Sequence, residues 1–249
     1  TLLMGLILGL GAGIALAFAL EFLDNTIKSV DDVARNNLAV LGIIPSIGQP
    51  DKRKRRFPFF GKTSFLSASG SRGLRRRLMT REDPKSPVSE AYRSLRTSLL
   101  YSSSKKEPKS ILISSAGPGE GKTTTVANLA ITYANLGKKT LLVDTDLRRP
   151  VVHKVFELNR EPGITTYLSA STDDYKSLIQ KCEIDNLDII TAGIIPPNPS
   201  ELLGSDRMTT LVKQLENDWD MVLFDSPPLV AVTDATMISK EIDQIVMVV

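Results

Sequence analysis

The sequence has very few of the side chains that build redox centres and soft-metal sites. Its 249 residues include one cysteine, Cys182, and one histidine, His153. A single cysteine excludes an intramolecular disulfide and argues against a cysteine-based zinc site. A single histidine excludes a multi-histidine site, so any bound metal must be held by oxygen ligands, which favours magnesium or a similar hard cation.

Charged side chains are missing from the first segment. No Asp, Glu, Lys or Arg occurs between Leu2 and Leu20, and Glu21 is the first charged residue. As an α-helix this run would be about 29 Å long, close to the thickness of a bilayer core. The basic residues that precede the apolar stretch of a signal peptide are absent, and a buried core helix is usually shorter. We therefore predict a transmembrane helix over residues 1–23.

Apolar anchors are scarce between residues 49 and 87, where Lys, Arg, Ser, Gly and Pro dominate. We predict a basic flexible linker over 49–87, preceded by a juxtamembrane segment over 24–48. The basic cluster from Lys52 to Arg56 favours the cytoplasmic side of a membrane. It could lie on the anionic inner leaflet or only fix the topology. No pattern of stacking aromatic residues is interleaved with these charges, so we expect no nucleic-acid partner.

From residue 88 onward, short apolar runs alternate with helical patterns. We expect helices over 89–101 (with Ser89 as its cap), 122–136 and 205–217, and strands over 110–114, 140–143, 187–191, 221–224 and 245–249. A further strand-like run covers 38–45. The alternation predicts an α/β domain over 88–249, with a mostly parallel sheet and helices on both of its faces. Ligands of such sheets bind at the carboxyl ends of the strands.

A glycine-rich loop lies between the first of these strands and the next helix. Residues 116–124 form a Walker A motif in the strand–loop–helix context that it requires, although Ala116 stands where glycine is more usual. Backbone N–H groups of such a loop converge on phosphate oxygens, and the following helix adds the positive end of its dipole. The predicted nucleotide-binding residues of this P-loop fold are Gly117, Gly119, Glu120, Gly121, Lys122, Thr123 and Thr124.

Carboxylates follow two of the predicted strands. Asp144 and Asp146 end one strand, and Asp225 ends another. Beside a P-loop such groups can hold magnesium directly or through water, or accept the proton of an attacking hydroxyl. Each could also be a plain helix cap. Together with Lys122, which would meet the β- and γ-phosphates, and Thr123, whose hydroxyl suits magnesium, they predict a site for a magnesium–nucleotide complex.

In these motifs the sequence resembles the bacterial tyrosine kinases (BY-kinases) that regulate capsule and exopolysaccharide synthesis. The residues that carry the resemblance are the Walker A loop, the additional Walker motif at 142–150, the Walker B motif at 224–228, the loop at 197–203 and the oligomerisation motif ExxRxxR formed by Glu90, Arg93 and Arg96. The apolar segment and residues 22–27 resemble the end of a polysaccharide chain-length regulator (Wzz-type) domain that is fused to such kinases.

The resemblance implies an enzyme that transfers phosphate from ATP to tyrosine with Mg²⁺, and that autophosphorylates between subunits. It implies that Lys122, Asp144 and Asp146 are catalytic, with Asp144 activating the tyrosine hydroxyl or exchanging that role with Asp146. Magnesium would be held by Thr123, Asp146 and Asp225. The implied role of Glu90, Arg93 and Arg96 is to join subunits into a ring, although a pair within one helix is the alternative reading of that spacing.

The implied partners are other copies of the chain, the polysaccharide polymerisation and export machinery, a protein tyrosine phosphatase and the bacterial inner membrane, with the kinase domain in the cytoplasm. The family usually ends in a tyrosine-rich tail, and the five tyrosines here form no cluster. The chain starts without Met and stops within an apolar run. We therefore expect a longer protein, with an extracytoplasmic domain before residue 1 and further sequence after residue 249.

Two other classes stay open. Partition and division-site ATPases are similar P-loop proteins that act as nucleotide-dependent switches, but they usually carry a second lysine early in the Walker A loop, where this chain has Gly117. A non-catalytic polysaccharide co-polymerase that binds nucleotide only to regulate chain length is the other alternative.

Overall fold

The computed structural model describes residues 5, 9–11, 13, 14, 16, 18, 33, 39–45, 78–102, 107–230 and 232–249. The chain divides into a first unit, Thr1–Val40, and a compact unit, Leu41–Val249. The described residues up to Phe18 are helical and exposed, large apolar side chains among them. No helix within the described residues has the length and apolarity needed to cross a membrane. Most of the predicted membrane segment, 1–23, lies outside them.

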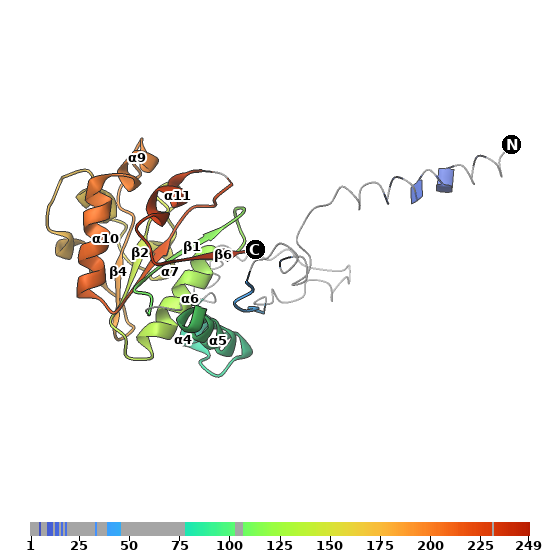
Figure 1. The fold of residues 1–249 in the computed structure, drawn as a ribbon, viewed down its shortest axis with the longest axis horizontal. Helices are drawn as coiled ribbons and strands as arrows, with labels where there is room; N and C mark the ends of the chain where they lie inside the picture. The colour runs from blue at the N-terminus through green and yellow to red at the C-terminus, as the bar shows by residue number, and fades with distance from the viewer. Residues whose placement is uncertain are drawn as a thin grey trace, which may run out of the picture. The chain divides into compact units, whose positions relative to one another are not determined.

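A mostly parallel sheet forms the centre of the described part of the compact unit (Figure 1). Its six strands have the order β3-β4-β2-β5-β1-β6. They are β1 (Ser110–Ser115), β2 (Thr140–Asp144), β3 (Gln180–Lys181), β4 (Leu187–Ile190), β5 (Met221–Asp225) and β6 (Gln244–Val248). The neighbours β4, β2, β5, β1 and β6 are all parallel, whereas β3 is antiparallel to β4. The predicted sheet is confirmed, and the short β3 is an addition to it.

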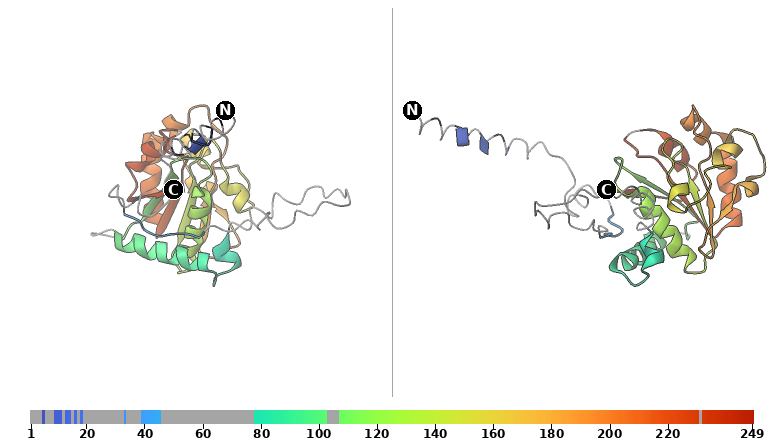
Figure 2. Two further views of the ribbon diagram at one scale, coloured as in Figure 1. Left: turned by 90° about the vertical axis from the view of Figure 1, so that its right-hand side faces the viewer. Right: turned by 180° about the vertical axis from the view of Figure 1, so that it is seen from behind.

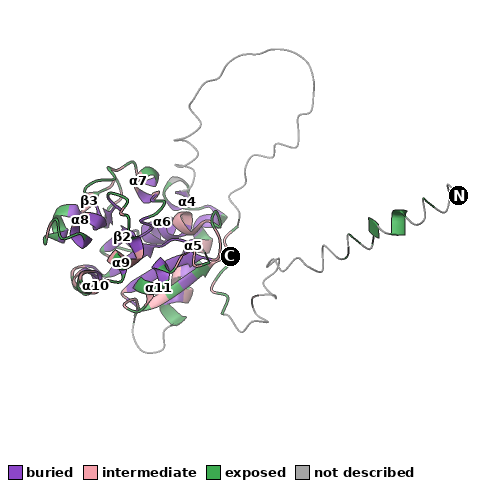
Figure 3. Cartoon of the chain, turned by 90° about the horizontal axis from the view of Figure 1, so that it is seen from above, coloured by how far each residue is buried: buried purple, intermediate pink, exposed green. Residues whose placement is uncertain are grey.

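Helices cover both faces of this sheet, as predicted (Figures 1 and 2). One face carries α4 (Met79–Glu82), α5 (Pro87–Ser102), α6 (Lys122–Ala134) and α7 (Val152–Val155). The other carries α8 (Ile164–Leu168), the 3₁₀ helix η1 (Tyr175–Leu178), α9 (Pro199–Leu203), α10 (Asp206–Asp218) and α11 (Asp234–Ser239). Every residue of β1, β2, β4 and β5 is buried (Figure 3). Strands covered on both faces are apolar throughout rather than alternating, which is why these read as continuous apolar runs.

The predicted linker, residues 49–87, ends earlier than expected. Residues 78–87 belong to the compact unit, where Leu78 and Thr80 are buried. The backbone N–H and the hydroxyl of Thr80 both donate to Asn128 Oδ1 in α6, at 3.1 and 2.9 Å. Helix α5 also begins before the expected Ser89, because the hydroxyl of Ser86 accepts from the Ser89 backbone N–H at 3.1 Å and caps the helix. Residues 49–77 lie outside the described part.

Residues 39–45 form no strand, contrary to the expectation for 38–45. Leu41 and Ile44 instead pack against the core under α5 and α6. The apolar residues of this run are therefore anchors for an irregular segment. A short apolar run has the same composition whether it pairs in a sheet or packs as a single extended segment, so the pattern could not separate the two.

Candidate active site

The P-loop occupies the turn between β1 and α6, as the motif predicts. Gly119 and Gly121 have φ of 91° and 95°, in the left-handed region that favours glycine. A Cβ at either position would meet no atom within 4 Å. Backbone conformation, rather than crowding, therefore requires glycine at both positions. Gly121 is the N-cap residue of α6, so the loop delivers its N–H groups at the positive end of that helix.

Sheet register brings the predicted carboxylates to this loop. Asp144 at the end of β2 lies directly opposite Asp225 at the end of β5, and Asp225 in turn pairs with Ile113 of β1. The backbone N–H of Thr145 donates to the Asp225 carbonyl at 2.8 Å and fixes the chain just beyond β2. Three parallel strands thus end at one edge of the sheet, which is where an α/β protein binds its ligand.

Lys122 and Thr123 each contact one of these carboxylates. Lys122 Nζ lies 3.1 Å from Asp146 Oδ2, and both side chains are largely shielded from solvent. The Thr123 hydroxyl donates to Asp225 Oδ2 at 2.7 Å. The other oxygen, Asp225 Oδ1, is buried and has no hydrogen-bond partner among the described residues. Four of the predicted site residues are therefore brought into one cluster, and that cluster contains an unsatisfied buried acceptor.

Asp144 is placed differently from the expectation. It is completely buried, and its two carboxylate oxygens accept from the backbone N–H groups of Asp146 and Val152, each at 3.2 Å. Burial, and then the nearby Asp225 and Asp146, raise its pKa well above the ordinary value. In the free protein this carboxyl is enclosed, and Asp146, which is 4% exposed, is nearly as buried. Which of the two activates the tyrosine hydroxyl stays a prediction.

Burial also governs Asp225. It raises the pKa of this carboxyl to about 7, although the positive charge of Lys122 and the hydrogen bond from Thr123 act in the opposite direction. The proximity of Asp146 raises it further. The free site is thus short of positive charge, and a cation would relieve that deficit.

The donor atoms fit a magnesium ion that arrives with a nucleotide. No three His, Cys, Asp or Glu side chains form a metal cage within the described residues. Magnesium is commonly held by one or two carboxylates together with substrate phosphates, so a complete protein cage is not needed. Thr123 and Asp225, with Asp146 nearby, are the residues that would hold it, and the unpartnered Asp225 Oδ1 is a ready ligand. When bound, the ion supplies neutralisation of phosphate charge.

The remaining predicted P-loop residues have structural contacts of their own. Glu120 Oε2 accepts from the Gly117 backbone N–H at 2.9 Å, so its carboxylate closes the loop on itself. A Cβ at Gly117 would lie 3.1 Å from the same carboxylate. Thr124 lies in the first turn of α6, where its carbonyl accepts from the Asn128 amide at 2.8 Å. In the free protein Glu120 therefore holds the loop closed, and its contact with a nucleotide stays a prediction.

One ion pair beside the site, formed by a half-exposed arginine and a buried carboxylate, was not predicted. Arg148 Nε and Nη2 donate to the two carboxylate oxygens of Asp234, at 2.8 and 3.1 Å, and the Ser200 hydroxyl donates to Asp234 Oδ1 at 2.5 Å. Burial would raise the pKa of Asp234, but the hydrogen bonds from Arg148 and Ser200 lower it. Ser200 falls in the loop that the motif comparison singled out, whereas no sequence pattern marks Asp234.

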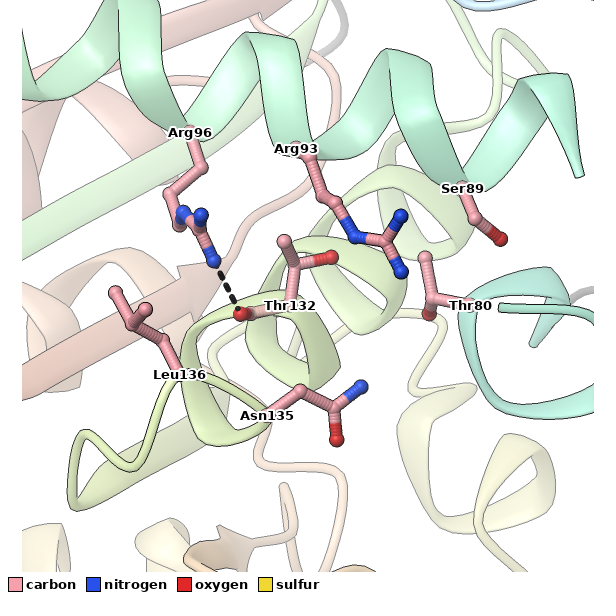
Figure 4. Close-up of a pocket in the computed structure, with 7 residues that line it drawn as sticks. All are labelled: Thr80, Ser89, Arg93, Arg96, Thr132, Asn135 and Leu136. Atoms are coloured by element: carbon pink, nitrogen blue, oxygen red, sulfur yellow. Dashed lines mark hydrogen bonds between the residues drawn. The ribbon is translucent and has the colours of Figure 1, made fainter. Parts of the chain in front are cut away.

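The ExxRxxR residues lie on α5, away from this cluster. Arg93 pairs with Glu90 and donates to the Pro84 carbonyl at 2.7 Å, while Arg96 Nη1 donates to the Thr132 carbonyl near the end of α6, at 2.9 Å. The contact within one helix, which is the alternative reading of the ExxRxxR spacing, is therefore present between Glu90 and Arg93. Both arginines line a pocket of about 230 Å³ between α5 and α6 (Figure 4). Its lining residues are Thr80, Ser89, Arg93, Arg96, Thr132, Asn135 and Leu136.

A P-loop between β1 and α6, with carboxylates at the ends of β2 and β5, defines a nucleotide-binding P-loop protein. A family model described as an AAA domain matches residues 108–249. The tyrosine-protein kinase YwqD of Bacillus subtilis is 43% identical over 180 residues, which are 72% of this chain and 75% of that protein. The chain belongs to the bacterial tyrosine-protein kinases.

Two further matches support this family. The tyrosine-protein kinase etk of Escherichia coli is 33% identical over 239 residues, 96% of this chain but 32% of that protein. The solved kinase domain of Escherichia coli ETK has a TM-score of 0.75 at 30% identity, covering 90% of this chain and 82% of the other. The predicted enzyme class, a protein-tyrosine kinase, is confirmed by these relatives.

Proposed function

We propose that this chain is the cytoplasmic catalytic part of a membrane-anchored tyrosine kinase that phosphorylates other copies of itself, using Mg-ATP. The observation that carries the proposal is the convergence of Lys122, Thr123, Asp146 and Asp225 on the P-loop. A positive charge, a hydroxyl and two carboxylates at the N-terminus of one helix are the groups that phosphoryl transfer uses to bind and orient the terminal phosphate.

The Lys122–Asp146 contact suggests how the site would change on binding. In the free protein the ammonium group of Lys122 is neutralised by Asp146. Incoming phosphates would compete for Lys122, because they carry more negative charge than one carboxylate. Asp146 Oδ2 would then be free to accept the proton of a tyrosine hydroxyl. Lys122 and Asp146 together would couple nucleotide binding to the activation of the acceptor.

Membrane anchoring through residues 1–23 is part of the proposal. Its support is the uncharged run of the sequence and the exposure of large apolar side chains at Leu10, Ile14, Leu16 and Phe18. The similarity to etk extends over 96% of this chain and so reaches beyond the P-loop domain. We place the chain at the bacterial inner membrane, behind a Wzz-type domain, with residues 24–48 as the juxtamembrane segment and the basic stretch from residue 49 facing the cytoplasm.

The proposal also includes self-assembly into a ring through Glu90, Arg93 and Arg96. This self-assembly is supported by the half-exposed position of the Glu90–Arg93 pair on α5 and by the arginine-lined pocket beside it. We propose that the assembled kinase regulates polymerisation and export of an exopolysaccharide or capsule, and that a protein tyrosine phosphatase reverses its phosphorylation.

Lys122→Met tests the proposal most directly. We expect it to reduce Mg-ATP hydrolysis and phosphorylation of an added tyrosine peptide by about 100-fold or more, because the loop loses its only side-chain cation at the phosphates. Lys138→Met is a matched control, since Lys138 also pairs with a carboxylate, Glu107, at 3.0 Å but on the surface. Wild-type protein that hydrolyses ATP without phosphorylating tyrosine would instead identify a nucleotide switch.

A further inference from the structure

The five tyrosines of this chain differ sharply in exposure. Tyr101 is 79% exposed, whereas the other four are 8% exposed or less. The buried ones are Tyr92, Tyr133, Tyr167 and Tyr175. Another molecule can phosphorylate a tyrosine only if the phenolic oxygen protrudes from its own fold and can enter that molecule's active site. Tyr101 meets that condition in the folded state.

The buried tyrosines are held by contacts that would have to break first. Tyr175 donates to Asp218 Oδ2 at 2.5 Å, and the Arg207 guanidinium lies 4.5 Å from the ring centre of Tyr167. Tyr92 is 1% exposed between α5 and α6, and the hydroxyl of Tyr133 is fully enclosed. Exposing any of these rings would also expose part of the hydrophobic core and lose the free energy of its burial.

Tyr101 lies far from the nucleotide site of its own chain. Tyr92 of α5 interacts with Thr125 in the first turn of α6, and Arg96, one turn further along α5, donates to the Thr132 carbonyl near the end of α6. Helix α6 starts at the P-loop, so α5 leads away from it, and Tyr101 lies about 14 Å further along than Tyr92.

Contacts at the end of α5 agree with this direction. The Gln244 amide, where β6 begins, donates to the Ser102 hydroxyl at 3.0 Å and to the Leu99 carbonyl at 3.3 Å. Strands begin at the edge of a parallel sheet opposite the P-loop. The phenol of Tyr101 is therefore near the amino edge of the sheet, and the phosphate-binding loop is at the carboxyl edge. Only a second molecule can bring the two together.

We infer that Tyr101 is a phosphate-acceptor site that is modified in trans by a second copy of the chain. The inference rests on the proposed self-phosphorylation and names its acceptor. The phenolic oxygen forms a bond to the γ-phosphorus of ATP held by the other copy, and the bond from that phosphorus to the β–γ bridging oxygen breaks. ADP leaves with the bridging oxygen, and the phenolic proton passes through Asp146 of that other copy to solvent.

The surroundings of Tyr101 suit an acceptor. It is the next-to-last residue of α5, and the side chains of Thr97 and Ser102 beside it are also exposed. Helix ends open more easily than helix centres, so the last turn can adapt to a binding cleft at low cost. The resulting phosphate adds a charge of about −2 on the helix that carries Glu90 and Arg93.

A mixing experiment tests the inference on the whole chain. Isotopically heavy Lys122→Met protein, which has lost its own phosphate-binding lysine, serves as the acceptor, and light wild-type protein serves as the donor with Mg-ATP. Mass spectrometry then locates phosphotyrosine on the heavy chain. We expect phosphate at Tyr101. The heavy double variant with Tyr101→Phe should lose most of it, while the matched double variant with Tyr167→Phe should keep it.

The outcomes separate this inference from the proposed kinase activity. An unphosphorylated Tyr101, in a mixture where an added tyrosine peptide is phosphorylated, would overturn the inference and leave the kinase standing. Phosphate at Tyr101 of the light chain alone would overturn transfer between molecules. If the peptide also stays unphosphorylated, the proposed function itself fails, and the acceptor assignment fails with it.

Discussion

Two arginine–carboxylate pairs in this kinase have similar chemistry and different surroundings. At the carboxyl edge of the sheet, Arg148 binds Asp234, whose side chain is completely buried. On α5, Arg93 binds Glu90, and the two side chains are 42% and 63% exposed. Water can hydrate both members of the α5 pair, but it cannot reach the carboxylate of Asp234.

This difference in hydration decides what each pair can do. A buried carboxylate depends on its partner, so the Arg148 pair holds the segment after β2 to α9 and α11 and contributes to the structure of the site. An exposed pair adds little to folding, because each member exchanges its partner for water at small cost. Its charged groups therefore remain available to another molecule, which fits the proposed role of Glu90 and Arg93 between subunits.

The largest effect on stability is expected from Arg148→Ala. It leaves the Asp234 carboxylate buried with Ser200 as its remaining side-chain partner. Loss of one member of a buried pair costs about 3–5 kcal/mol. The guanidinium of Arg148 is itself 42% exposed, so we expect the lower end, about 3 kcal/mol. Urea denaturation of wild type and variant measures this difference in the free energy of unfolding.

Asp234→Asn provides the matched comparison for that pair. It removes the buried charge and leaves an arginine that can turn to solvent, so its cost should be smaller, about 1 kcal/mol. Equal costs for the two variants would show that Asp234 is hydrated rather than enclosed. An Arg148→Ala cost below about 0.5 kcal/mol would place this pair in the same class as the exposed one.

A second, smaller effect concerns pH. The folded-state pKa of Asp225 is about 7 against an ordinary 3.8, so the folded protein binds more protons than the unfolded protein between these values. Its contribution to stability is therefore present at low pH and is lost as pH rises from about 4 to 7. The whole shift corresponds to about 4 kcal/mol, and neighbouring carboxylates share it, so Asp225→Asn should stabilise the free protein by about 2 kcal/mol at pH 8.

The measurement is the difference in unfolding free energy between variant and wild type at pH 5 and at pH 8. Taking this difference removes the pH dependence of groups that do not interact with Asp225; Asp144, whose pKa Asp225 raises, still contributes to the change. The gain should be less than half as large at pH 5 as at pH 8, about 0.8 against about 2 kcal/mol, because stability is lost progressively between the two pKa values. A difference that is the same at both pH values would mean that Asp225 is ionised throughout, and that the free site carries its full negative charge.

Much of the site could be predicted because its residues occur in short contiguous motifs. Lys122 and Thr123 follow the glycine loop directly, and Asp146 and Asp225 follow strands whose apolar runs are unmistakable. Parallel strands end at one edge, so the motifs had to meet there. The helices on both faces followed from the same alternation of elements.

Burial and tertiary pairing could not be predicted. Asp144 and Asp146 look equivalent in the sequence, and only the fold shows that Asp144 is enclosed by backbone N–H groups. Asp234 lies 86 positions from Arg148, a separation that no local pattern spans. The sequence places Thr80 in the predicted linker because the residues around it are mostly polar. Its hydrogen-bond partner, Asn128, lies 48 positions later in the sequence, in α6.

The smallest expected effect completes the comparison of the two pairs. Glu90→Ala should lower the free energy of unfolding by only about 0.3 kcal/mol, as is typical of exposed pairs three or four residues apart in a helix. The same variant should weaken self-association if α5 forms the proposed subunit contact. Sedimentation velocity and urea denaturation on one preparation measure both quantities.

Exchanging the two charges separates folding from assembly. The double variant Glu90→Arg with Arg93→Glu keeps an opposite-charge pair on α5, so its stability should stay within about 0.5 kcal/mol of wild type; the arginine in the first helical turn is slightly unfavourable. The charge pattern offered to another molecule is reversed, and self-association should fall as much as in Glu90→Ala. If association survives the exchange while the free energy of unfolding drops by more than about 1 kcal/mol, the pair stabilises the helix rather than the assembly. Side-chain exposure would then not separate the role of this pair from that of Arg148 and Asp234.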